Sequence, residues 1–214
     1  MIAVITGDII SSRKVENQEV WLSPLKSLLT TWGSTPTSWE IKRGDYFQVE
    51  ISNPQEALIK ALEIKSLLRK IQLPEQRKTS SPVDVRIGIG IGDKTYSGET
   101  ISESNGTAFI NSGEKFDLLK KENSTIGVRT AYHELDEEIN LYLKLASLFM
   151  DKWTITSAEL ALIVLQNPHI KQSDIGERLD IKQNSVSGRW KRANLDEVFE
   201  VNEMFKKKIQ KLIK

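Results

Sequence analysis

The chain has 214 residues, of which 39% are hydrophobic and 28% are charged, and its formal net charge is only +1. This length and composition predict a globular protein that forms one large domain or a medium domain with a small one, and a charge near zero selects no partner. Because the chain has no cysteine, disulfides, thiolate metal sites and a cysteine nucleophile are excluded.

The first ten residues, MIAVITGDII, differ from a secretory signal. They are apolar, but they lack a cationic segment, and Asp8 interrupts them. No stretch of the sequence reaches the roughly 18 apolar residues that a membrane-spanning helix needs. We therefore expect a cytoplasmic protein with no membrane contact, in which the Arg-Gly-Asp tripeptide at residues 43–45 has no role in cell adhesion.

Strand and helix patterns alternate in the first part of the chain. Runs rich in β-branched and aromatic residues predict strands, and apolar residues spaced three or four apart predict amphipathic helices. Gly44 and Asp45 separate two strand patterns as a tight turn would, and Asn53 followed by Pro54 is typical of a helix start. The predicted strands are 1–10, 38–43, 46–51, 83–91 and 125–128, the predicted helices are 19–32, 54–71 and 108–121, and a polar loop is predicted at 73–82.

The strand pattern at 83–91, VDVRIGIGI, contains Gly88 and Gly90. Interior glycines weaken a strand, and they indicate that another backbone or a ligand approaches closely. The predicted order is β-α-β-β-α-β with one further helix and strand. A β-α-β-β-α-β core is the ferredoxin-like arrangement, so we expect an α+β fold for this part.

The rest of the chain predicts helices only. Residues 132–153 carry a helical stripe without Gly or Pro, which predicts a stiff connector helix. Residues 171–214 hold 11 Lys and Arg against 7 Asp and Glu, and this local excess of positive charge predicts a separate basic module. We expect a sheet-and-helix domain at 1–130, a connector at 131–153 and a small all-α domain at 154–214.

The segment QSDIGERLDIKQNSVSGRW, residues 172–190, has the apolar spacing of a helix-turn-helix. Ile175 and Leu179 fall on one face of a first short helix, and Val186 with Trp190 can pack a second helix against it. A helix at 156–167 would complete a three-helix unit, and an amphipathic helix is predicted at 203–214.

Two positions suit the geometry of this unit. Gly176 stands where the two helices pass closely, so a small residue is needed there. Asp180 stands at the turn, where glycine is commoner, and Asp tolerates left-handed geometry better than most residues.

The second helix of this unit would display amides and cations to the outside. Amides and Arg read base edges in the major groove of DNA, whereas Lys and Ser contact phosphates. We therefore predict binding to double-stranded DNA; the alternative is a small helical domain with a basic face that contacts protein. The predicted DNA-binding residues are Lys182, Gln183, Asn184, Ser185, Ser187, Arg189, Lys191 and Arg192.

Asp8 ends the first strand, and Asp45 lies in the predicted hairpin turn. In the expected sheet these strands can lie side by side, which would bring two carboxylates to one edge. That arrangement suits one or two divalent cations and a nucleoside triphosphate. The alternative is that Gly44 and Asp45 only form the turn.

Four stretches resemble the class III nucleotidyl cyclases. AVITGDIISSR is similar to their first metal motif, IKRGDYFQVEI to their second, VRIGIGIG to their Val-Arg-Ile-Gly-Ile strand, and NGTAFINSGEKFDLL to their Gly-x-x-x-Asn helix. Over nearly all 214 residues the chain looks closer still to the SatD family, bacterial proteins in which a cyclase-like domain precedes a helix-turn-helix.

The resemblance implies a site for Mg²⁺ or Mn²⁺ and a nucleotide. Asp8 and Asp45 match the two metal-binding aspartates of the cyclases, and the backbone carbonyl of Ile9 matches a supporting ligand. The nucleotide contacts that it implies are Gly44, Phe47 and Arg86.

The resemblance also implies candidate catalytic residues. Cyclases select the purine with a lysine four residues before the second aspartate, where this chain has Ile41, with Lys42 one place along. They stabilise the transition state with an Asn and an Arg four residues later, a spacing that Asn111 and Lys115 reproduce with a one-residue shift.

Three functions remain open at this point. The first is a regulator in which a metal or nucleotide at the sheet controls DNA binding. The second is an active nucleotidyl cyclase or related phosphoryl-transfer enzyme. The third is a non-catalytic dimerisation or interaction protein. Cyclases build their sites across a two-fold pair, and most helix-turn-helix proteins bind DNA as pairs, so we expect a homodimer.

Overall fold

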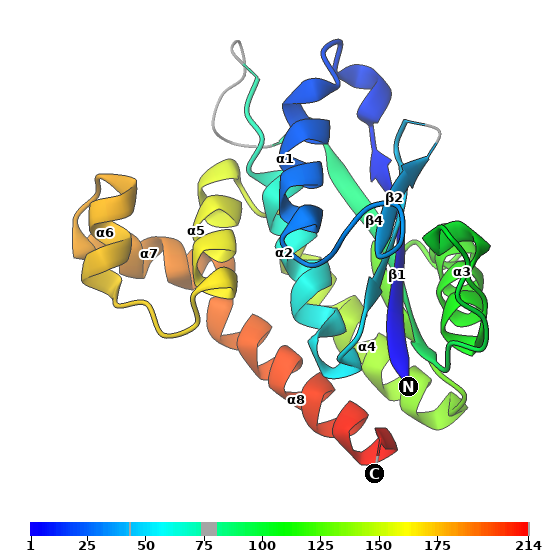
Figure 1. The fold of residues 1–214 in the computed structure, drawn as a ribbon. Coiled ribbons are helices and arrows are strands. Elements are labelled where there is room, and N and C mark those ends of the chain that lie inside the picture. The colour runs from blue at the N-terminus through cyan, green and yellow to red at the C-terminus, as the bar shows by residue number, and fades with distance from the viewer. Residues whose placement is uncertain (43, 74–80, 214) are drawn as a thin grey trace.

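The computed structural model describes residues 1–42, 44–73 and 81–213. Arg43 and most of the loop predicted at 73–82 lie outside the described residues. Within them the chain has a mixed α/β fold with a five-stranded sheet and eight α-helices (Figure 1). The strands are β1 (Ile2–Ile10), β2 (Trp39–Lys42), β3 (Tyr46–Ile51), β4 (Asp84–Gly92) and β5 (Ile126–Arg129). The helices are α1 (Glu19–Thr30), α2 (Ala57–Arg69), α3 (Thr107–Leu119), α4 (His133–Met150), α5 (Ile155–Gln166), α6 (Gln172–Leu179), α7 (Gln183–Ala193) and α8 (Leu195–Ile213).

The predicted strands and helices are confirmed, and most of their ends differ by only a few residues. The exception is α8, which begins well before residue 203, because Leu195 and Val198 extend its buried face. Nowhere in the described ranges is a helix long and apolar enough to cross a membrane.

The sheet has the strand order β2-β3-β1-β4-β5. The central strand β1 pairs antiparallel with β3 and β4, β2 pairs antiparallel with β3, and β5 runs parallel to β4 at the other edge. Residues 3–7 of β1 are all buried, because helices cover both faces of the sheet. That is why the N-terminal run is continuously apolar instead of alternating.

Helices α1 and α2 cover one face of the sheet, and α3 covers the other (Figure 1). The backbone of α3 approaches β4 so closely that a Cβ atom on Gly90 would overlap the backbone of Ala108 and Ser112. At Gly88 a Cβ atom would lie 2.6 Å from the backbone nitrogen of Phe116. The sequence predicted that either another backbone or a ligand approaches these glycines, and the structure shows a backbone, that of α3.

The C-terminal helices pack into the same hydrophobic core as the helices that cover the sheet. Helix α5 packs on α2, and the buried side chains of both helices belong to one apolar cluster that continues to α7 and α8. Helix α8 crosses α4 (Figure 1), where Lys208 Nζ lies 2.6 Å from Glu138 Oε2. Helix α4 also lies along β5, because Asn140 accepts a hydrogen bond from the amide of Val128 and donates one to its carbonyl.

A buried ionic cluster joins α2 to β4 and to the end of α4. Asp84 accepts hydrogen bonds from Lys65 Nζ at 3.0 and 3.2 Å and from Arg69 Nη1 at 2.7 Å. Lys65, which is 1% exposed, also lies 2.7 Å from Asp151. Arg69 Nη2 donates to the carbonyl of Trp153 at 2.8 Å. These contacts attach the segment that follows α4 to the sheet.

Candidate functional site

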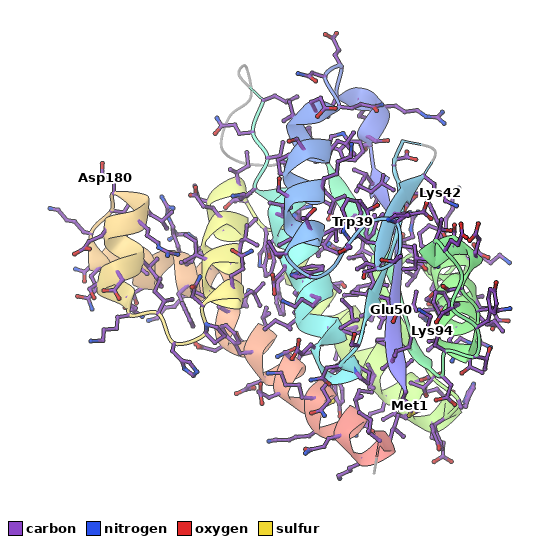
Figure 2. All side chains as sticks on the ribbon, in the orientation of Figure 1. Met1, Trp39, Lys42, Glu50, Lys94 and Asp180 are labelled. Atoms are coloured by element: carbon purple, nitrogen blue, oxygen red, sulfur yellow. The ribbon has the colours of Figure 1, made fainter. Side chains whose placement is uncertain are left out.

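Four polar residues form a row across one end of the sheet. The register places Lys42 opposite Tyr46, and it places Asp8 between Tyr46 and Arg86. Residues that face each other across neighbouring strands lie on the same face of a sheet. The row lies on the α3 side, because the ring of Tyr46 meets that of Phe116 edge-on with centroids 5.8 Å apart. Figure 2 shows Lys42 at this end of the sheet.

Asp8 lies between a cation and a second carboxylate. The Nη1 atom of Arg86 is 3.4 and 3.5 Å from the two carboxylate oxygens of Asp8, which are long distances for an ion pair. Burial raises the pKa of Asp8, Arg86 opposes that rise, and the neighbouring carboxylate of Asp45 adds to it. The charge of Asp8 is therefore incompletely compensated, and a cation bound at this edge would stabilise it.

The hairpin tip folds back against the end of β1. The backbone carbonyl of Asp45 accepts a hydrogen bond from the amide of Ile9 at 3.1 Å, and its carboxylate accepts one from the hydroxyl of Ser12 at 2.8 Å. Gly44 adopts a φ of 87°, which glycine allows without strain. Ser11 adopts a φ of 64°, which is uncommon for a residue with a side chain and is often found at binding sites.

The donor set at this edge fits a hard divalent cation. Asp8 and Asp45 offer carboxylate oxygens, which Mg²⁺ and Mn²⁺ prefer. In the described ranges no group of three or more His, Cys, Asp or Glu side chains could hold a metal. A cation here would therefore complete its coordination with backbone carbonyls, water or the phosphates of a nucleotide.

Two other residues implied by the resemblance lie near this edge, and one lies on the opposite face. Lys42 is in the row, where it pairs with Glu40 at 3.4 Å and donates to the hydroxyl of Ser102. Arg86 has a buried Nε atom with no hydrogen-bond partner in the part of the chain that the structure describes. Phe47 is fully buried, and its ring packs against Gly7 on the α1–α2 side of the sheet.

Asn111 and Lys115 do not lie with the carboxylates. Asn111 donates to the carbonyl of Ile91 at 2.9 Å. Ile91 pairs with Ala3, which lies five residues from Asp8, or about 17 Å along the strand. Lys115 is buried, and its Nζ atom lies 2.7 Å from Glu122. Within one chain, Asn111 and Lys115 therefore form their contacts away from the candidate metal ligands, whereas Lys42 lies in the same row as Asp8.

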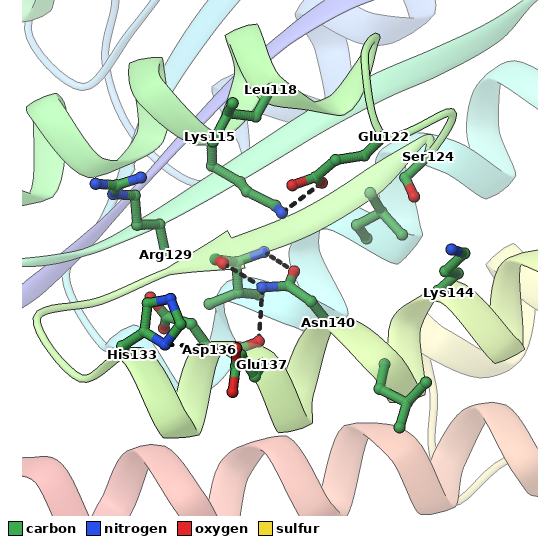
Figure 3. A pocket seen from close by; sticks show the side chains of 13 residues that line it. Lys115, Leu118, Glu122, Ser124, Arg129, His133, Asp136, Glu137, Asn140 and Lys144 are labelled. Atoms are coloured by element: carbon green, nitrogen blue, oxygen red, sulfur yellow. Dashed lines mark hydrogen bonds and ion pairs between the residues drawn. The ribbon is translucent and has the colours of Figure 1, made fainter.

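Lys115 instead borders a cavity of about 540 Å³ between α3, β5 and α4 (Figure 3). Asp136 lies in its wall and accepts hydrogen bonds from the amide of Thr130 at 2.9 and 3.0 Å. Burial raises the pKa of Asp136, and these hydrogen bonds oppose the rise. The sequence did not indicate this cavity, because it depends on how the consecutive elements α3, β5 and α4 pack against one another.

The segment from α6 to α7 has the two local features that the sequence predicted. A Cβ atom on Gly176 would lie 2.8 Å from the carbonyl oxygen of Ile181, so only glycine fits there. Asp180 ends α6 in a left-handed conformation, with φ 50° and ψ 49°, and Figure 2 shows it at the outer tip of this segment. Ile175 and Val186 are fully buried between the helices.

The start of α7 is open to solvent. The side chains of Lys182, Gln183, Asn184 and Ser185 are all exposed. Ser187 is half-buried, and Lys191 and Arg192 are exposed at the far end of the helix.

Two residues of α7 have partners that the sequence did not indicate. Arg189 is only 18% exposed, and its Nη1 atom lies 3.4 Å from Glu159 of α5. The ring of Trp190 stacks on Phe199 of α8 with centroids 6.0 Å apart, and its indole nitrogen donates to Asp196 at 2.8 Å. Trp190 thus packs α7 against α8, in addition to any role beside α6.

Comparison with known proteins identifies the family of the chain. A search of curated proteins found no match. The sequence model of the SatD family matches residues 1–209, which is almost the entire chain. The chain therefore belongs to the SatD family.

Proposed function

We propose that this protein is a cytoplasmic regulator that binds double-stranded DNA through α6 and α7 and a divalent cation or nucleotide at the end of the sheet. The observation that carries the proposal is the exposed start of α7, which follows a tight left-handed turn at Asp180. In helix-turn-helix proteins, the first residues of the second helix enter the major groove.

The side chains at this position suit DNA. Lys182 can contact phosphate, and the amides of Gln183 and Asn184 can read adenine edges. The first turn of α7 has no acidic residue, so the positive end of the helix dipole is left for a phosphate group. Arg189 contributes less than the sequence suggested, because its guanidinium is engaged with Glu159.

DNA binding is tested by removing exposed cations from α7. The triple variant Lys182→Ala, Lys191→Ala, Arg192→Ala should bind a mixed-sequence duplex more weakly than the wild type. A plot of the logarithm of the association constant against the logarithm of the salt concentration has a negative slope. In the triple variant this slope should be less steep by about 2 to 3, because each lost phosphate contact reduces its steepness by about 0.9. Fluorescence anisotropy of a labelled duplex over a salt series measures both quantities.

The matched control removes exposed lysines from α8 instead, as Lys207→Ala with Lys211→Ala. This control should keep the wild-type salt slope, because α8 lies outside the proposed DNA-facing surface. Equal losses in the two variants would show non-specific attraction and would reject α7 as the DNA-binding helix.

The end of the sheet supports the second half of the proposal. Asp8 and Asp45 offer two carboxylates at one edge, and Arg86 offers a buried nitrogen without a protein partner among the described residues. The order β2-β3-β1-β4 is the one expected of a ferredoxin-like core, with β5 appended. We propose that Mg²⁺ or Mn²⁺ lies between the carboxylates and that Arg86 contacts a phosphate of a bound nucleotide.

Titration calorimetry with Mn²⁺ tests the cation site. The wild type should release or absorb heat with a saturable isotherm, and Asp8→Asn or Asp45→Asn should abolish it. Asp93→Asn is the control, because Asp93 is exposed and pairs with the N-terminus at the opposite end of β1. An isotherm that is unchanged by Asp8→Asn and Asp45→Asn would reject the site.

An active cyclase is the second candidate function. The carboxylate pair favours it, but Asn111 and Lys115 form their contacts elsewhere in the chain, and we therefore rank binding above catalysis. The enzyme would have to take its Asn and Lys from a partner subunit. Conversion of a nucleoside triphosphate to a cyclic product, lost in Asp45→Asn, would reverse this ranking.

A further inference from the structure

Helix α4 has an apolar stripe that no other part of the described chain covers. Leu141, Leu145 and Leu148 are 55%, 52% and 64% exposed, respectively. The spacing of four and three residues places them on one side of the helix. The opposite side of α4 already packs into the core through Ile139 and Leu143, so this helix is apolar on two sides.

Charged residues extend the stripe at both of its ends. Glu137 lies one turn before Leu141, and the exposed Lys152 lies four residues after Leu148, in the turn that directly follows the last residue of α4, Met150. Glu137 is 71% exposed, and its carboxylate lies 3.6 Å from Nδ1 of His133. Lys152 forms no ion pair within the ranges that the structure describes. The stripe therefore runs from a negative charge through three leucines to a positive charge.

Such a stripe is complementary to itself when reversed. If two copies of α4 packed antiparallel with a two-fold axis beside Leu145, Leu141 of one copy would face the Leu148 position of the other. Glu137 of each copy would then face the Lys152 position of the other, at both ends. A parallel arrangement would instead place equal charges together. Two-fold interfaces of this kind are the commonest in homo-oligomers.

We propose that the Leu141–Leu145–Leu148 face of α4 is the interface through which two copies of this chain form an antiparallel dimer. Burial of the three leucines from each copy supplies the driving force, because apolar area is removed from water. The ion pairs at the two ends select the antiparallel orientation.

The stripe adjoins the 540 Å³ cavity, which Leu141 and Lys144 also line (Figure 3), so the interface has a hollow at its side. This inference does not rest on DNA or metal binding.

Sedimentation equilibrium measures the first consequence. The wild type should have about twice the 24.3 kDa mass of one chain, and Leu148→Glu should have the mass of a monomer with an unchanged circular dichroism spectrum. Ile110→Glu is the matched control, because Ile110 is 52% exposed on α3 and lies outside the stripe; it should remain a dimer. A monomeric wild type, or a dimeric Leu148→Glu variant, would overturn the proposal.

Charge reversal tests the orientation. Glu137→Lys or Lys152→Glu alone should raise the dimer dissociation constant by about tenfold, because each places like charges together at both ends. The two reversals combined should restore the wild-type constant. If the combined variant is as weak as the single variants, the antiparallel arrangement is wrong.

The absence of cysteine from the chain allows a direct test of the two-fold axis. Leu145→Cys should form a disulfide-linked dimer on mild oxidation, because this position lies next to the proposed two-fold axis and therefore close to the same position of the other copy. Ile110→Cys should not. Cross-linking of the two variants at equal rates would show random collision and would overturn the proposed axis.

Discussion

Replacement of Asp84 with alanine is expected to lower the free energy of unfolding by about 3 kcal/mol, which is the range for breaking a buried ion pair. Asp84 accepts hydrogen bonds from both Lys65 and Arg69. Lys65 would keep Asp151 as a partner at 2.7 Å. Among the described residues, Arg69 would keep the carbonyl of Trp153 as an acceptor, so a buried guanidinium would lose its counter-charge. Equilibrium denaturation in urea measures the change.

Two variants separate the charge effect from the loss of a side chain. Asp84→Asn keeps the shape of the side chain and one hydrogen-bond acceptor. It should therefore lower the free energy of unfolding by less than Asp84→Ala does, although the negative charge is still lost. Asp93→Ala removes a carboxylate that is 70% exposed and should change stability by less than about 0.5 kcal/mol. Equal stability of Asp84→Ala and Asp93→Ala would contradict the importance of the cluster.

Gly90→Ala is the second substitution with a large expected effect. The added methyl group would overlap the backbone of Ala108 and Ser112, and neither β4 nor α3 can move without disturbing the sheet. Overpacking of this kind typically costs about 1–3 kcal/mol, and a clash with backbone atoms should fall at the upper end. Thermal unfolding, followed by circular dichroism, should show a lower midpoint than for the wild type.

Gly113→Ala, on the helix α3 that Gly90 contacts, is the matched control. A Cβ atom at Gly113 would have no neighbour within 4 Å, and alanine is favoured over glycine in a helix by about 1 kcal/mol. This variant should therefore raise the midpoint. If Gly90→Ala were as stable as Gly113→Ala, the close approach of α3 to β4 would be wrong.

Local patterns were sufficient to predict most of the elements. The left-handed turn at Asp180 and the close contact at Gly176 were predicted because both depend on neighbours within about ten residues. The hairpin around Gly44 followed from its turn residues for the same reason. A close approach to Gly88 and Gly90 was also predicted, although the sequence left open whether a backbone or a ligand makes it.

Contacts between distant segments were not predictable in the same way. Lys65 and Arg69 look like surface residues of an amphipathic helix, and they are buried only because Asp84 and the end of α4 supply counter-charges and acceptors. Arg189 was predicted to face DNA, yet Glu159 lies beside it. The exposed leucines of α4 were also missed, because the same helix has a second apolar side that accounts for its pattern.

The indole nitrogen of Trp153 donates to the carbonyl of Ala193, the last residue of α7, at 2.8 Å. The carbonyl of Trp153 itself accepts from Arg69, which holds Asp84 at the beginning of β4. Asp84 lies two residues from Arg86. A short relay of hydrogen bonds thus runs from the strand beside the carboxylate pair to the end of the proposed DNA-facing helix. In a two-fold pair, this rigid attachment would fix the separation of the two α7 helices. Under the proposed DNA-binding function, such a pair would distinguish DNA sites by the spacing of their halves as well as by their bases.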